Sequence, residues 1–104
     1  ACSVDYKTND WGSGFTAEVT ITNRGTDPID GWTLGYTFPG NQKITNGWNG
    51  TWSQSGANVT VKNASWNGNI AAGATVSIGF QGTYSGTNAA PTSFTVNGVT
   101  CARS

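Results

Sequence analysis

The sequence predicts an all-β fold, an antiparallel β-sandwich of the immunoglobulin-like or jelly-roll-like kind with about eight or nine strands. Apolar residues alternate with polar ones along several stretches, and clusters of turn-forming residues separate these stretches. No window carries the apolar stripe of an amphipathic helix, and the chain contains a single leucine, Leu34. Short alternating strands without helices are typical of two packed sheets, so a sandwich is the expected architecture.

The clearest alternation runs from Phe15 to Thr22, with apolar residues at the odd positions and Thr or Glu at the even positions. In chain order, the expected strands cover 4–6, 15–22, 32–38, 43–48, 59–61, 76–80, 93–96 and 99–101. Turn formers separate them at 23–28, 39–41, 55–56, 72–73 and 97–98, where Gly, Pro and Asn gather.

The outward positions of two segments, 16–22 and 75–81, hold small or flat polar residues that carry almost no charge. A flat polar sheet face of this kind is a candidate binding surface. An ordinary solvated face has the same composition, so the pattern by itself leaves both interpretations open.

The 104 residues fit one domain, residues 1–104, which is large enough to bury a hydrophobic core. Five basic residues balance five acidic ones, and charged residues make up 10% of the chain. An average domain carries about 25%. Nucleic acids and anionic membranes require a basic patch, so we expect neither as a partner. The 39 Thr, Asn, Ser and Gln residues suit a neutral, hydroxyl-rich partner instead.

Cys2 and Cys101 stand near the two termini and are the only cysteines. As a disulfide they close a loop of nearly the whole chain, worth up to about 4–5 kcal/mol in the chain-entropy model. Two free buried thiols are the alternative, and a metal site is disfavoured because the chain has no His and no third Cys. We expect the disulfide, no metal and no cofactor. Disulfides persist in oxidising compartments, so we expect a secreted protein.

The five tryptophans fall into two groups. Trp32 is in phase with Leu34 and Tyr36, so we expect it in the core. Trp11, in "NDWGSGF", and Trp66, in "NASWNGNI", sit among small polar residues instead. If the strand containing Val59 and Val61 continued, Trp66 would be in phase with its outward side chains. We therefore expect both rings to be exposed.

Trp48 lies in "NGWNGTW" without an apolar neighbour, and we expect it to be exposed as well. By parity it shares a face with Ile44, so an outward Trp48 requires a β-bulge or a strand end near Gly47. For Trp52 the sequence leaves two positions open, the binding face and the core, and we favour a half-buried position at the edge of the core.

Exposed Trp rings among polar residues are rare unless a ligand covers them. A flat indole offers its π-face to the apolar C–H face of a pyranose, and the amides of Asn9, Asn46 and Gln81 can bond sugar hydroxyls. Stacking of flat bases on aromatic rings is worth about 1–3 kcal/mol each, and sugar stacking lies at or below that range. The alternative is that these rings fill the rim of the core.

The chain resembles a family 2 carbohydrate-binding module, the bacterial cellulose-binding type. The resemblance covers essentially the whole chain and rests on the terminal cysteines and on "NDWGSGFTAEVTITN", "GWTLGYTF", "NASWNGNI" and "GTYSGTNAAPTSFTVNG". It implies a flat strip of Trp11, Trp48 and Trp66 that stacks on crystalline cellulose. It also implies accessory polar contacts at Asn9, Glu18, Asn46 and Gln81, of which Glu18 stands where an amide is expected.

Such modules are tethered to endoglucanases, exoglucanases or xylanases that bacteria secrete. The resemblance therefore implies a tethered catalytic domain as a partner, and we expect the module itself to be a monomer. A related subgroup binds xylan and carries an arginine three residues after the first tryptophan. Here that position is Gly14, which leaves room for Trp11 to lie flat against the sheet and favours cellulose.

Three other functions compete with this interpretation. An intrinsic glycoside hydrolase needs two facing carboxylates, and the candidates, without a His base, are Asp5, Asp10, Glu18, Asp27 and Asp30. Turn chemistry explains Asp27 and Asp30. A protein-recognition domain would mix its aromatic residues with Arg and Leu in a hot spot, which is not the pattern here. Chitin and xylan remain as alternative ligands of a binding module.

Overall fold

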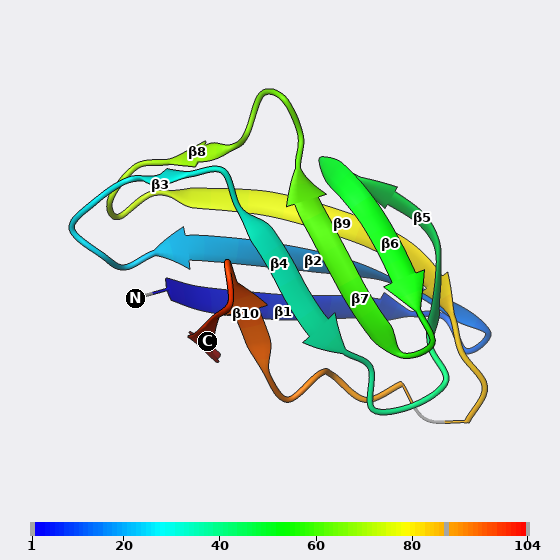
Figure 1. Cartoon of the computed structure of the whole chain (residues 1–104). Coiled ribbons are helices and arrows are strands. Elements are labelled where there is room, and N and C mark those ends of the chain that lie inside the picture. The colour runs from blue at the N-terminus through cyan, green and yellow to red at the C-terminus, as the bar shows by residue number, and fades with distance from the viewer. Residues whose placement is uncertain (1, 87, 104) are drawn as a thin grey trace.

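The computed structural model describes residues 2–86 and 88–103, whose secondary structure consists of eleven strands (Figure 1). The strands are β1 (Cys2–Asp10), β2 (Gly14–Asn23), β3 (Ile29–Asp30), β4 (Thr33–Thr37), β5 (Lys43–Trp48), β6 (Gly50–Ser55), β7 (Asn58–Asn63), β8 (Asn69–Ile70), β9 (Thr75–Thr83), β10 (Phe94–Val96) and β11 (Val99–Arg103). The predicted all-β class is confirmed.

Nine of these strands form one sheet in the order β5-β9-β2-β1-β11-β10-β4-β7-β6, and β3 pairs with β8 in a small second sheet. The long sheet folds back on itself into a sandwich that is nearly a barrel. Figure 1 shows the two layers, with β1, β2 and β9 crossing behind β4, β7 and β6. We call β5, β9, β2 and β1 the first layer, and β10, β4, β7 and β6 the second layer.

The two end strands of the long sheet, β5 and β6, follow each other in the chain through Asn49, and the side chain of Gln54 joins β6 to the start of β5. Its Oε1 accepts a hydrogen bond from the backbone N–H of Ile44 at 2.9 Å, and its Nε2 donates to the carbonyl of Gln42 at 2.9 Å. A side-chain amide thus takes the place of a backbone ladder at the seam of the sandwich.

Eight of the nine strand pairings among the described residues are antiparallel, as predicted, and β1 with β11 is the parallel exception. β3, β6 and β8 were not expected. β3 and β8 have two residues each, which is too short for an alternating pattern. β6 carries Trp52 as its only apolar residue, so its outward and inward positions look alike in the sequence.

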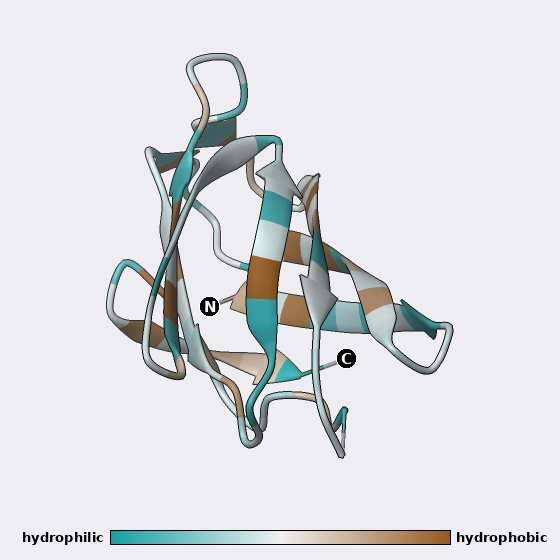
Figure 2. Cartoon of the chain, turned by 90° about the vertical axis from the view of Figure 1, so that its right-hand side faces the viewer, coloured by the Kyte–Doolittle hydropathy of each residue, from teal (hydrophilic) through white to brown (hydrophobic). Residues whose placement is uncertain are grey.

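The core lies between the layers and is built from the alternating apolar residues, which appear as brown bands along the strands in Figure 2. Trp32 is fully buried among them, as predicted. The predicted disulfide is also present: Cys2 at the start of β1 is bonded to Cys101 in β11, at a sequence separation of 99. It ties the first strand of the chain to the last one.

Candidate functional site

The outward side of the first layer collects the predicted polar residues in one row. Strand register places Asn46 of β5 opposite Gln81 of β9, Gln81 opposite Thr16 of β2, and Thr16 opposite Asn9 of β1. Since side chains alternate between the two faces of a strand, all four project from the same face. We call this side of β5, β9, β2 and β1 the outer face.

The next row of the outer face contains Trp48, Gly79, Glu18 and Lys7 in the same strand order. Glu18 is exposed, and the residue opposite it in β9 is Gly79, which has no side chain. The residues that the resemblance assigned to sugar contact, Asn9, Glu18, Asn46 and Gln81, therefore occupy two adjacent rows.

Trp48 reaches the outer face because β5 contains a bulge. The register shifts between Ile44, which lies opposite Gly82, and Asn46, which lies opposite Gln81. The extra residue, Thr45, reverses the parity of the strand, so Ile44 packs against the core while Trp48 points outward. The bulge that an outward Trp48 requires is therefore present, two residues before Gly47.

Trp48 and Trp11 each lie over a glycine. A Cβ added to Gly79 would lie 2.5 Å from the Trp48 Nε1 atom, and a Cβ added to Gly14 would lie 2.9 Å from the Trp11 Cζ2 atom. Both glycines face outward, on neighbouring strands. Gly14 is paired with Thr83, which lies four residues along β9 from Gly79. The two glycines, which we call the seats of Trp11 and Trp48, are therefore about 13 Å apart along the strands. Each indole rests against backbone where a side chain would otherwise stand.

The exposed fractions of the three predicted rings are 52% for Trp11, 42% for Trp48 and 74% for Trp66. They are three of the four large hydrophobic side chains that are exposed among the described residues, and the fourth is Val99. The alternative that these rings fill the rim of the core therefore does not hold.

The turn that carries Trp11 is fixed by the carboxylate of Asp10. Its Oδ1 accepts hydrogen bonds from the Gly12 N–H at 2.8 Å and from the Tyr84 hydroxyl at 2.7 Å, and its Oδ2 accepts one from Asn88 Nδ2 at 3.1 Å. These bonds, led by that from Gly12, hold the pKa of Asp10 below its ordinary value because they favour the charged carboxylate. The opening turn is thus bonded to the segment that follows β9.

Trp66 lies in the turn 64–68 and not on an extension of β7, which ends at Asn63. Its exposure therefore follows from the turn and not from strand alternation. The backbone of this turn is bonded to the core tryptophan, because Trp32 Nε1 donates to the Asn67 carbonyl at 2.8 Å. Within the turn, Asn67 Oδ1 accepts a hydrogen bond from the Ala64 N–H at 2.8 Å.

Trp52 is half-buried at the core edge, as expected. Its ring centroid is 5.1 Å from that of Phe80, and its Nε1 donates to the Trp48 carbonyl at 3.2 Å. It packs on the inward side of Gly47 and so contributes to the support beneath Trp48 rather than to the exposed strip.

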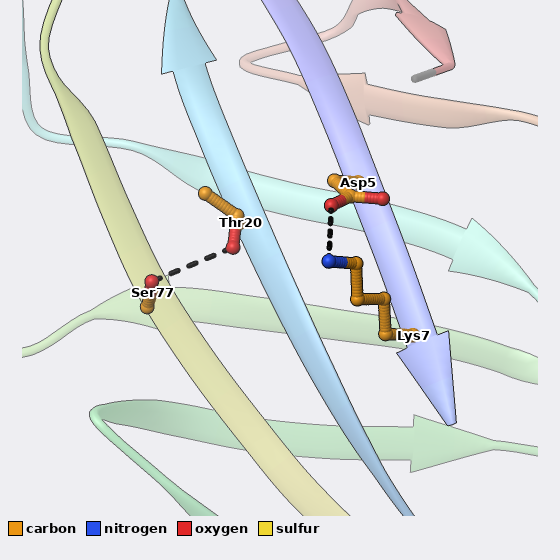
Figure 3. A network of polar contacts seen from close by, with 4 residues as sticks. All are labelled: Asp5, Lys7, Thr20 and Ser77. Carbon is orange, nitrogen blue, oxygen red and sulfur yellow. Dashed lines mark hydrogen bonds and ion pairs between the residues drawn. The ribbon is translucent and has the colours of Figure 1, made fainter. Parts of the chain in front are cut away.

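Figure 3 shows a polar group on the outer face that the sequence interpretation did not single out. Lys7 forms an ion pair with Asp5 at 3.7 Å, and the hydroxyls of Thr20 and Ser77 lie 3.4 Å apart. Asp5 and Lys7 stand two residues apart on one strand, a spacing that places both side chains on one face, so the sequence did contain this signal.

Gly79 is the other site residue that the sequence interpretation missed. It occupies an outward position between Ser77 and Gln81, where the pattern calls for a polar side chain. A glycine within a strand often marks a close approach of other atoms, here the Trp48 ring.

Among residues 2–86 and 88–103, no group of three or more His, Cys, Asp or Glu side chains is placed to hold a metal ion. The same residues contain no helix that is long and apolar enough to cross a membrane.

Comparisons with known proteins agree with the geometry. The family described as "Cellulose binding domain" matches residues 2–101. Exoglucanase A of Cellulomonas fimi is 56% identical over 100 residues, which cover 96% of this chain and 12% of that enzyme. Endoglucanase CelA of Streptomyces lividans is 51% identical over 105 residues, 99% of this chain and 23% of that enzyme. The chain thus corresponds to a small part of these enzymes.

Chitin-related proteins are also similar. Chitinase C of Streptomyces lividans is 42% identical over 95 residues, 91% of this chain and 15% of that enzyme. The solution structure of the chitin-binding domain of Chi18aC from Streptomyces coelicolor has a TM-score of 0.78 at 37% identity and covers 97% of this chain and 94% of that one. The disulfide-closed sandwich, the exposed indoles and the match over residues 2–101 together place the chain in the cellulose binding domain family.

Proposed function

We propose that this chain is a non-catalytic module that binds the flat surface of crystalline cellulose through Trp11, Trp48 and Trp66. The observation that carries the proposal is the pair of indoles laid over Gly14 and Gly79 on one outer face. A ring that lies flat on a sheet presents its π-face outward, which is the orientation that stacking on a flat polysaccharide surface requires.

The expected affinity follows from the number of rings. Each ring contributes a stacking free energy at or below about 1–3 kcal/mol. Three rings can therefore supply up to about 8 kcal/mol, which corresponds to micromolar binding. No deep pocket is needed, because a crystal face is itself flat. Three modest contacts on a rigid support bind such a surface without a cleft.

The polar rows supply hydrogen bonds beside the rings. Asn9, Asn46 and Gln81 are exposed on the outer face and carry both donors and acceptors, which match sugar hydroxyls. Glu18, in the row of Trp48, accepts hydrogen bonds from hydroxyl groups. We assign these four side chains to accessory contacts, and Gly14 to specificity through the orientation of Trp11.

The partner of the module is a tethered polysaccharide hydrolase, which the module holds on the plant cell wall. Support comes from the relatives, where the matched region is 12% of an exoglucanase and 23% of an endoglucanase. The disulfide and the bacterial relatives favour a secreted bacterial protein. We propose that the module acts as a monomer.

Chitin is the second candidate ligand, and one observation favours it. The similar structure with a TM-score of 0.78 is that of a chitin-binding domain, so the same fold carries a chitin-binding function elsewhere. Its sequence identity of 37% is lower than the 56% shared with exoglucanase A, which is why we rank cellulose first.

The test is adsorption of the isolated module on crystalline cellulose, chitin and insoluble xylan, beside a reducing-sugar assay for hydrolysis. We expect the strongest adsorption on cellulose and no release of sugar. Trp11→Ala, Trp48→Ala and Trp66→Ala should each weaken adsorption, whereas Val99→Ala, which removes an exposed apolar side chain elsewhere, should not. If the three Trp variants adsorbed as strongly as the parent module, the proposal would be contradicted. Stronger adsorption of the parent on chitin than on cellulose would reverse the order of the two ligands.

A further inference from the structure

We infer that Asn67 is a positioning residue of the proposed binding site, which holds Trp66 in place relative to Trp48 through a relay of amide hydrogen bonds. The inference rests on the proposed function, because it assigns a role within that same site. It concerns how one exposed ring is held and not which ring touches the ligand.

Trp66 needs such support more than the other two rings do. Its side chain is 74% exposed, compared with 52% and 42% for Trp11 and Trp48, which lie against glycines in strands. A ring with so little packing takes its position from its backbone. The geometry of the turn 64–68 therefore decides where the Trp66 indole stands.

Most of the hydrogen bonds that connect this turn to other segments lead to the second layer and its connections. Trp32 Nε1 donates to the Asn67 carbonyl at 2.8 Å, Asn63 Nδ2 donates to the Ala64 carbonyl at 2.9 Å, and the Gly31 N–H donates to the Gly68 carbonyl at 2.6 Å. Asn63 ends β7, and Trp32 directly precedes β4. These bonds hold the turn, but they do not connect it to the layer that carries Trp11 and Trp48.

One relay makes that connection. Asn67 Nδ2 donates to the carbonyl of Asn49 at 2.7 Å, and Asn49 Nδ2 donates to the carbonyl of Ser77 in β9 at 3.1 Å. Asn49 directly follows Trp48, and Ser77 lies two residues before Gly79, the seat of Trp48. Among the hydrogen bonds of the described residues, the one from Asn67 to Asn49 is the only bond between turn 64–68 and the segment 43–55, which contains β5 and β6.

The backbone of Asn49 is suited to this role. Its φ is 63°, in the left-handed region that Asn adopts more readily than most residues. In this conformation the Asn49 carbonyl accepts a hydrogen bond from Asn67 Nδ2, while Asn49 Nδ2 donates one to the Ser77 carbonyl. The relay therefore joins the turn 64–68 to β9 of the first layer through Asn49, the residue that directly follows Trp48.

A rigid ligand makes this support matter. A crystal face presents sugar rings at fixed positions, so a mobile or displaced indole must be ordered on binding, and that ordering weakens adsorption. A soluble oligosaccharide adapts to a shifted ring. Loss of the relay should therefore weaken binding to the crystal much more than binding to the soluble chain.

The variant that isolates the relay is Asn67→Asp, which has nearly the same shape. Its Oδ1 still accepts from the Ala64 N–H, and its carbonyl still accepts from Trp32 Nε1, but the donor to Asn49 is lost. Asn49→Gly is the uncharged counterpart, because glycine keeps the left-handed backbone and removes the donor to Ser77. Asn58→Asp is the matched control, since it adds the same charge on the second layer and its Oδ1 still accepts from Thr37.

Relative to the control, Asn67→Asp and Asn49→Gly should weaken adsorption on crystalline cellulose about 3- to 10-fold, as loss of one ordinary hydrogen bond does. Their binding of a soluble cello-oligosaccharide should change less than about twofold. In NMR relaxation, the indole N–H of Trp66 should become more mobile while that of Trp32 stays rigid. Equal losses on the crystal and the soluble chain, or an unchanged Trp66 signal, would overturn the inference.

A double variant tests whether Asn67 acts through Trp66. In a Trp66→Ala background, Asn67→Asp should weaken adsorption no further, because the ring that it holds is absent. A further loss of similar size would show that Asn67 acts in another way. If the parent module did not adsorb on cellulose at all, the proposed function would fail, while the relaxation data would still judge the relay.

Discussion

The indole of Trp48 lies directly on Gly79 of the neighbouring strand, so closely that a Cβ at position 79 would stand 2.5 Å from its Nε1 atom. The contact combines a bulge in one strand with a missing side chain in the other. The bulge turns the ring outward, and the glycine leaves it room to approach the backbone of β9.

The first prediction concerns this seat. Gly79→Ala should lift Trp48 from the sheet, because the added methyl group and the ring cannot occupy the same space. One stacking contact of about 1–2 kcal/mol is then lost, so adsorption on crystalline cellulose should weaken about 5- to 30-fold. Adsorption isotherms and a melting curve measure the two effects. Thr75→Ala, on the outward side of the same strand, is the control, and equal adsorption by both variants would contradict a flat Trp48.

The second prediction concerns Gly14 and ligand choice. Gly14→Arg should turn Trp11 out of its seat, because the Cβ alone would lie 2.9 Å from the ring. Adsorption on crystalline cellulose should weaken about 5- to 30-fold, and binding of soluble xylan should improve. Gly14 does not have a positive φ, so the backbone itself tolerates the substitution. Ser13→Arg adds the same charge in the adjacent position, and a matching xylan gain in that control would argue against the role of Gly14.

The third prediction concerns pH. Hydrogen bonds from Gly12, Tyr84 and Asn88 lower the pKa of Asp10, so the folded state favours the carboxylate more than the unfolded state does. The stabilisation is fully present above the unfolded pKa of about 3.9 and is lost as the pH falls through the lower folded pKa. Adsorption should thus be constant from about pH 5 to 8 and decline only below about pH 4, as the Trp11 turn loosens. Asp10→Asn should remove this acid-dependent step, and a step that persisted in the variant would belong to another group.

The fourth prediction separates stability from binding. Reduction of the Cys2–Cys101 bond should lower the melting temperature by several degrees or more, since about 1 kcal/mol shifts a domain of this size by about 4–8 °C. The bond lies at the start of β1, whereas Trp11 follows the end of that strand. Adsorption well below the melting temperature should therefore be unchanged, as calorimetry and isotherms with and without reductant can measure. A large loss of adsorption by the folded, reduced protein would mean that the bond shapes the outer face.

The sequence was sufficient to predict the parts of the fold that depend on local patterns. Period-two alternation located β2, β4 and β9, and the same phase argument placed Trp32 in the core. It did not locate β6, where only one apolar residue interrupts a polar strand, or the two-residue strands of the small sheet.

The candidate site depended more on relationships between distant residues. Parity required a bulge near Trp48 but did not identify Thr45 as its position, because any small polar residue can occupy a bulge. The relay from Asn67 to Asn49 spans 18 residues and the one from Asn49 to Ser77 spans 28. Among 11 asparagines in the chain, no local pattern distinguishes those that make such bonds.

The parallel pairing of β1 and β11 and the disulfide between them also determine how the module responds to mechanical tension. A pull applied at the two ends of the segment 2–101 is carried by the covalent sulfur bridge, so the intervening strands bear none of it. A pull from one end alone enters β1 and β11 together, in the middle of the long sheet, rather than peeling a strand from its edge. In the proposed arrangement, tension from a tethered hydrolase would therefore enter the module at the middle strands of the long sheet and not at an edge strand.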